Sequence, residues 1–235
     1  MALTALPEET GLEVFYPDSD GEPMAENTIQ YQYIITIQVG LDAMFADNPD
    51  VFVAADLFWY PVEGRPDIKT APDVMVVLGR PKGHRGSYKQ WEENGVAPQV
   101  VFEIASPGNT VAEMRLKRMF YNRYGVEEYY EYDPETGTLD VWTRQKGLLQ
   151  TAFFLHEWRS PLLGVILKLE ADGELTVYAP SGERFLRPVE IKVLADLAEA
   201  RAEQERARAE QEHERAERLA AKLRELGIDP KQIDG

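Results

Sequence analysis

The chain of 235 residues contains no cysteine, which excludes disulfide bonds and thiolate metal sites. Histidines are scarce as well: the three present are scattered along the chain as His84, His156 and His213, so a zinc site built on imidazoles is not expected. No apolar run approaches the roughly eighteen residues that a membrane span needs, and the first residues lack the basic start and apolar core of a signal peptide. These absences predict a soluble, cytoplasmic protein with no membrane contact.

Basic residues are also few, with 25 Lys and Arg against 41 Asp and Glu, for a formal net charge of −16. The imbalance is uneven: residues 191–235 hold 11 acids and 9 bases, which leaves 30 acids and 16 bases in residues 1–190, a net of −14. A body this acidic repels nucleic acid at long range. The charge therefore counts against tight non-specific DNA binding, although local basic patches can still exist.

The composition divides the chain after Pro188. Over the whole chain, the hydrophobic content of 44% and the aromatic content of 10% are typical of a globular protein, and the length suits one sizeable domain plus an appendage. Residues 191–227 are instead dense in Ala, Glu and Arg. We therefore predict a globular domain over residues 1–190 and a helical tail over residues 191–235.

The tail carries a heptad pattern. One seam consists of Ala195, Ala202, Ala209, Ala216 and Leu223, and the companion seam of Ala198, Glu205, Glu212, Leu219 and Leu226. Two interpretations remain open. The tail is either a solvated single helix held by pairs of Glu and Arg four residues apart, or a coiled coil through which the protein forms a homo-oligomer.

The stretch from residue 71 to 133 carries the candidate chemistry. Asp73 follows Pro72 at the start of one apolar strand, and Glu103 lies inside a second one, at residues 99–105. An acid within an apolar strand is costly unless it is paired or binds a metal. A helix capped by Asn109 or Thr110 and stopped by Gly125 then carries Lys117.

Two acids and a lysine are sufficient for metal-dependent phosphodiester hydrolysis. Mg²⁺ prefers carboxylate and carbonyl oxygens and keeps several waters, so Asp73, Glu103 and the Ile104 carbonyl are the candidate metal ligands. Lys117 would orient the attacking water or stabilise charge on the phosphate. In the alternative interpretation Asp73 caps a turn, Glu103 pairs with an arginine, and Lys117 is solvated.

Outside this centre, the sequence indicates a helix over residues 27–45 and one strand over residues 51–60. A hairpin is expected over residues 128–143, followed by strands at 149–155, 165–169 and 175–178. Residues 79–90 form a glycine-rich basic loop, which either contacts phosphates or is an ordinary surface turn.

Several stretches of this sequence together resemble the Uma family of restriction endonucleases, over roughly residues 12–190. They are DGEPMAENTIQYQYI, APDVMVVLG, YKQWEENGVAPQVVFEIASP, LKRMFYNRYGVEEYYEYDPETG and LLGVILKLEADGELTVYAPSGERFLRP. The resemblance implies an α/β (α+β) fold of the restriction-endonuclease-like type, with a mixed central sheet flanked by helices, to which this chain adds the long C-terminal helix.

The resemblance also implies catalytic residues of the PD-(D/E)xK type with a divalent metal. Asp73 after Pro72 matches the first acid, and Glu103 matches the second. Ala105 stands where the motif has its lysine, and Lys117 on the following helix matches the position that the family commonly uses instead. Glu26 is the candidate for an additional acid from the first helix region.

The function implied is hydrolysis of DNA by an endonuclease that uses Mg²⁺ or Mn²⁺, with DNA and a second copy of the chain as partners. A dimer would suit double-strand cutting, because two active sites can face opposite strands. RNA or branched DNA remains open as the substrate. The rival hypothesis is a catalytically inactive nuclease-fold scaffold that acts in protein assembly through its coiled-coil tail, which the acidic body and the displaced lysine favour.

Overall fold

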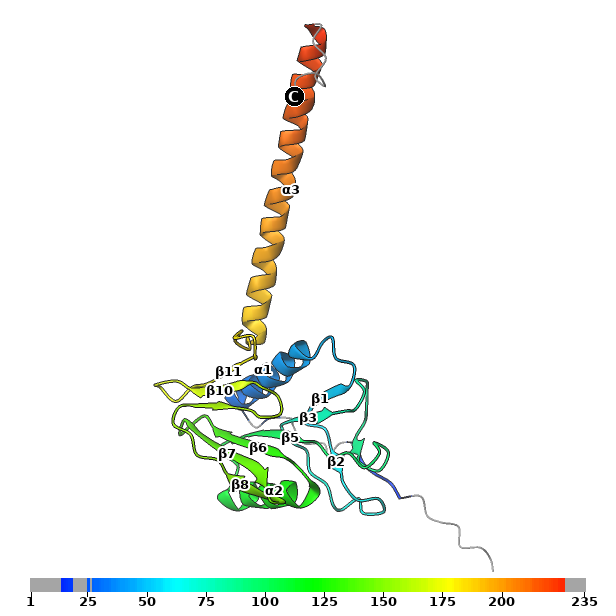
Figure 1. Cartoon of the computed structure of the whole chain (residues 1–235), viewed down its shortest axis with the longest axis vertical. Helices are drawn as coiled ribbons and strands as arrows, with labels where there is room; N and C mark the ends of the chain where they lie inside the picture. Colours follow the sequence, from blue (N-terminus) through cyan, green and yellow to red (C-terminus); the bar gives the residue numbers. More distant parts are fainter. Residues whose placement is uncertain (1–13, 19–24, 26, 227–235) are drawn as a thin grey trace, which may run out of the picture. The chain divides into compact units, whose positions relative to one another are not determined.

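The structure, a computed structural model, describes residues 14–18, 25 and 27–226, and Figure 1 labels its helices and strands. The chain divides into two compact units, Met1–Leu186 and Arg187–Gly235. We call the first unit the body.

A six-stranded mixed sheet forms the centre of the body, in the order β1-β3-β5-β6-β7-β8. Only β5 and β6 pair in parallel, and the other neighbours are antiparallel. The strands are β1 (Val51–Ala55), β3 (Val74–Leu78), β5 (Val100–Ile104), β6 (Glu128–Asp133), β7 (Thr138–Gln145) and β8 (Leu148–Thr151). The expected mixed sheet is confirmed.

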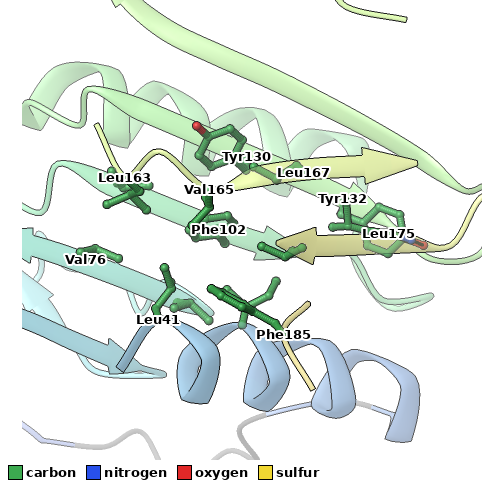
Figure 2. Close-up of a cluster of buried hydrophobic side chains, with 14 of the residues drawn as sticks. Leu41, Val76, Phe102, Tyr130, Tyr132, Leu163, Val165, Leu167, Leu175 and Phe185 are labelled. Carbon is green, nitrogen blue, oxygen red and sulfur yellow. Dashed lines mark hydrogen bonds between the residues drawn. The ribbon is translucent and has the colours of Figure 1, made fainter. Parts of the chain in front are cut away.

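Different elements cover the two faces of this sheet (Figure 1). Helix α1 (Thr28–Met44) and a three-stranded sheet of β9 (Glu157–Arg159), β10 (Ile166–Leu169) and β11 (Leu175–Tyr178) pack on one face. Figure 2 shows this layer, with Phe102 and Tyr130 of the central sheet near Val165, Leu41 and Phe185. Helix α2 (Val111–Tyr124) and a two-stranded sheet of β2 (Trp59–Tyr60) and β4 (Tyr88–Lys89) pack on the other face.

The expected first helix is confirmed, and so is its cap. The Asn27 side chain accepts a hydrogen bond of 2.8 Å from the Gln30 N–H, which satisfies one of the free donors at the helix start. Ile34, Ile37 and Leu41 are buried at spacings of three and four residues. This spacing turns one helical stripe toward the sheet.

The single strand expected over residues 51–60 is wrong. The structure has β1 and then the short β2, and Asp56 between them has a φ of +48°. This left-handed conformation, rare for a residue other than glycine, ends β1, and the Asp56 N–H donates to the Pro72 carbonyl at 3.1 Å. The chain then leaves the central sheet, and β2 pairs with β4 in the layer beyond it.

The expected hairpin is confirmed as β6 and β7, and its first residue, Glu128, is a buried acid. Glu128 accepts hydrogen bonds from the Tyr130 hydroxyl at 2.7 Å, the Leu162 N–H at 2.8 Å and the Ser160 hydroxyl. These donors tie β6 to the chain between β9 and β10, so Glu128 holds the two sheets together. Strand β9 was not expected from the sequence.

Residues 188–225 form one continuous helix, α3 (Pro188–Glu225), with none of its residues buried. Pairs of opposite charge four residues apart support it, such as Lys192 with Asp196 at 2.5 Å and Arg218 with Glu214 at 3.8 Å. Within the described part of the chain, neither this helix nor any other is both long and apolar enough to cross a membrane.

Candidate active site

The register of β3 and β5 brings the two candidate acids together. Val74 pairs with Phe102 in this antiparallel ladder, so Asp73, one residue before β3, lies across from Glu103. Because side chains alternate along a strand, both acids share the sheet face of Met75 and Val101, which is the face that α2 covers. Both are buried, with exposed fractions of 8% for Asp73 and 1% for Glu103.

Helix α2 places Lys117 over these acids. Thr110 caps the helix in a capping box with Glu113, and Gly125 ends it in the left-handed conformation with a φ of 101°. Lys117 and Tyr121, one turn apart, both reach Glu103. The Lys117 ammonium lies 2.7 Å from Glu103 Oε2, and the Tyr121 hydroxyl donates to Glu103 Oε1.

Asp73 is held by the backbone of the neighbouring strand, because its Oδ2 accepts the Ile104 N–H at 2.7 Å. Burial, together with the Glu103 charge, nevertheless raises the pKa of Asp73 to about 8. Burial lowers the pKa of Lys117, but the Glu103 and Asp73 carboxylates outweigh it, so this pKa lies above its ordinary value. Two ionised carboxylates would carry more negative charge than one lysine neutralises, and burial therefore favours the protonated form of Asp73 at neutral pH.

The donor set suits a hard cation of the Mg²⁺ type. Asp73 and Glu103 offer carboxylate oxygens, and the Ile104 carbonyl is the next acceptor along the strand. That carbonyl already accepts the Gln30 side-chain amide at 3.0 Å, but a carbonyl oxygen has a second lone pair. Among the described residues, no group of three or more His, Cys, Asp or Glu could hold a metal. Mg²⁺ retains several waters and does not need a full protein cage.

These acids belong to a longer row that crosses the sheet. Glu131 pairs with Glu103 and Asp140 pairs with Glu131, and the β1–β3 register places Asp56 across from Asp73. Burial raises the pKa of Glu131, with the Asp140 charge contributing in the same direction. Such a run of like charges on neighbouring strands destabilises the sheet. It therefore calls for bound cations or protons.

Two pockets open beside the row, one on each side of α2. A pocket of about 390 Å³ is lined by both Lys69 and Lys117, along with Thr70 and Phe120. Another of about 440 Å³ lies toward β6 and β7 and is lined by Arg118, whose guanidinium stacks 4.7 Å from the centre of the Trp142 ring. Lysines thus gather next to the candidate site, although the body as a whole is acidic.

The glycine-rich basic loop is less available for phosphate than its composition indicates. Arg80 and Arg85 both bind Glu93, at 2.7 and 2.6 Å, and Lys82 binds Asp42 at 2.9 Å. These pairs offset much of the positive charge of the loop and favour its interpretation as a structural surface turn.

The structure thus brings Asp73, Glu103 and Lys117 to one point, as the sequence predicted, while Glu26 lies outside the described residues. The partner of Glu103 is this lysine and not an arginine. Sequence analysis missed Tyr121 and Gln30 as supports of the site. Tyr121 had a usable signal, since a residue four positions after Lys117 lies on the same helix face. Gln30 had none.

Comparisons with known proteins bear on these observations. The family model Uma2, described as "Putative restriction endonuclease", matches residues 30–172. A solved structure from Anabaena variabilis, described as "a putative nuclease belonging to DUF820", is similar with 14% identity and a TM-score of 0.42, covering 55% of this chain and 68% of that one. No curated protein matches the chain. Because the family model spans more than half of the chain, the protein belongs to the Uma2 family, whose description supports a nuclease function.

Proposed function

We propose that the protein is a metal-dependent endonuclease that hydrolyses DNA phosphodiester bonds, with Asp73, Glu103 and Lys117 as its catalytic residues. The observation that carries this proposal is the 2.7 Å contact between Lys117 and Glu103, with Asp73 opposite Glu103 on the same face of the sheet. Asp73 just before β3, Glu103 in β5 and Lys117 in α2 converge there although they are far apart in the sequence.

In this proposal Asp73, Glu103 and the Ile104 carbonyl hold Mg²⁺ or Mn²⁺. The metal supplies charge neutralisation at the phosphate and an acidified water. Asp73 gives up its proton when the cation binds, because a carboxylate must be ionised to act as a ligand. Tyr121 fixes the rotation of the Glu103 carboxylate by its hydrogen bond to Oε1.

Lys117 contacts Glu103 and also faces a pocket. In the metal-free site its ammonium neutralises Glu103. Lys117 also lines a pocket together with Lys69, where its ammonium would donate a hydrogen bond to a phosphate oxygen of the substrate. A lysine on the following helix, rather than two residues after Glu103, can therefore serve the same purpose. The contact of Lys117 with Glu103 supports a catalytic role for the displaced lysine.

The substrate and the metal are tested together. We expect the purified protein with Mg²⁺ or Mn²⁺ to nick supercoiled plasmid and to lose this activity by at least about 100-fold in Asp73→Ala. Parallel assays on branched DNA and on RNA identify the preferred substrate. Because salt screens the repulsion between the acidic body and nucleic acid, we expect cleavage not to weaken steeply as salt is added. Equal nicking by wild type and Asp73→Ala would mean that the site is misplaced. No cleavage of any substrate, with the fold intact, would favour the assembly role.

A further inference from the structure

Helix α3 has a seam that no residue of its own unit covers within the part of that unit that the structure describes. Its alanine positions and its companion positions recur every seven residues from Ala195 to Leu226, and none of the helix is buried. Leu219 and Leu226 are 54% and 75% exposed. An apolar seam at heptad spacing packs against another helix with the same spacing.

The seam has an unusual order of sizes. Its first half contains Ala195, Ala198 and Ala202, and its second half ends in Leu219, Leu223 and Leu226. Glu205 and Glu212 interrupt it in the middle. Small residues thus occupy one half of the seam and large residues the other. Whether a small residue lies opposite a small or a large residue of a partner helix depends on the direction of that helix.

A parallel pair of identical helices would place equal positions opposite each other. Glu205 would face Glu205 and Glu212 would face Glu212, and like charges facing each other in a seam repel. The alanine half would also face alanines alone, leaving its layers underfilled. The parallel arrangement is therefore disfavoured by repulsion between the glutamates and by poor packing of the alanine layers.

An antiparallel pair removes both problems. When Ala195 lies opposite Leu226 of the second copy, the other layers are fixed. They are Ala198 with Leu223, Ala202 with Leu219, Glu205 with Ala216, and Ala209 with Glu212. Every layer then combines one alanine with one larger side chain, so no two glutamates meet.

In this direction, arginines beside the seam also lie near its two glutamates. Arg201, Arg208 and Arg215 alternate with Glu205 and Glu212 along one side of the helix. In the antiparallel register Arg208 comes beside Glu212 of the second copy, and Arg215 comes beside Glu205. Each seam glutamate then has an arginine of the second copy beside it, which lowers the cost of placing its charge in the seam.

We propose that α3 pairs with α3 of a second copy in an antiparallel two-helix coiled coil, with Ala195 opposite Leu226. Because the body precedes the helix in the chain, the two bodies would be attached at opposite ends, roughly 65 Å apart along the pair. This differs from a dimer whose two active sites face one cleavage point. That consequence rests on the proposed nuclease function, whereas the pairing itself does not.

The absence of native cysteine allows a direct test in the full-length protein. We expect a mixture of Ala195→Cys and Leu226→Cys, unfolded and refolded together, to form a disulfide-linked dimer under mild oxidation. Ala195→Cys alone should form none, because its two copies would lie roughly 46 Å apart. Cross-linking of Ala195→Cys with itself would show a parallel pair and overturn the proposal.

Light scattering measures the mass of the assembly in solution. Wild type should have the mass of two chains, and the double variant Leu219→Glu, Leu223→Glu should have the mass of one, with the unfolding temperature of the body unchanged. The matched double variant Ala200→Glu, Ala207→Glu adds the same charges outside the seam and should remain dimeric. A wild-type mass of one chain, or of more than two, would contradict the pairing.

Discussion

Asp73→Asn is expected to make the metal-free protein more stable at pH 8, raising its unfolding temperature by roughly 5 °C, while metal-dependent cleavage is lost. Asn keeps an oxygen that accepts the Ile104 N–H but removes a buried charge that lies opposite Glu103. Residues that serve binding or catalysis are often unfavourable for stability. Asp73 would be such a residue.

The expected gain depends on pH in a defined direction. The pKa of Asp73 is about 8 in the folded protein against an ordinary value of 3.8. Between these values the folded state binds more protons than the unfolded state, so the free energy of unfolding of wild type falls as pH rises from about 4 to about 8. The free energy of unfolding of Asp73→Asn should not fall in this way. Its advantage should be about 2 kcal/mol or more at pH 8 and should vanish near pH 4.

Chemical denaturation of both proteins across this pH range, in the presence of a chelator, measures the difference. Asp42→Asn, which changes an exposed acid, is the matched control and should follow wild type. A pH-independent difference between Asp73→Asn and wild type would show that Asp73 is already ionised in the metal-free protein.

Lys117→Met is expected to act in the opposite direction on stability and to reduce cleavage by about 100-fold to 10,000-fold. Glu103 is 1% exposed, and among the described residues its Oε2 would lose the only cation that lies within ion-pair distance of it. Breaking a buried pair by removing one partner costs about 3–5 kcal/mol. Since the Lys117 side chain is 31% exposed, we expect a loss of about 2 kcal/mol in the metal-free protein at pH 8.

Added Mn²⁺ should restore most of the stability of Lys117→Met but none of its cleavage, because a cation at the site replaces the missing charge on Glu103. Unfolding curves with and without Mn²⁺ measure the first effect, and plasmid nicking measures the second. Lys82→Met removes a comparable lysine from an exposed pair with Asp42 and serves as the control, with a change below about 0.5 kcal/mol. Full cleavage by Lys117→Met would exclude the lysine from catalysis.

Much of the fold was predictable because the helix ends carry local signals. Asn27, Thr110 and Gly125 mark the starts of α1 and α2 and the end of α2, and each makes the backbone contact that its residue type predicts. The break at Asp56 was not predictable. An apolar run that continues from β1 to β2 has no residue that requires a positive φ, and the turn depends on a hydrogen bond to Pro72, far along the chain.

The candidate site divides in the same way. Asp73 and Glu103 could be found because acids inside apolar strands are conspicuous. Lys117 could be found because it lies on the helix that follows the second strand. The row of acids across the sheet could not be predicted, because it depends on the pairing register of five strands. That register places Glu131 next to Glu103. The hydrogen bond from Gln30 to Ile104 joins residues 74 positions apart. No local pattern records such a contact.

The central claim is that the acids at the β3–β5 edge bind the catalytic metal, and a comparison of two isosteric variants tests it most directly. Glu103→Gln and Glu128→Gln each neutralise a buried acid of the central sheet, with exposed fractions of 1% and 2% in the wild type, but on opposite faces. Titration with Mn²⁺ followed by calorimetry, together with plasmid nicking, gives both readouts. We expect Glu103→Gln to lose Mn²⁺ binding and nicking, and Glu128→Gln to retain both. Mn²⁺ binding and nicking that survive in Glu103→Gln would contradict the assignment of the site.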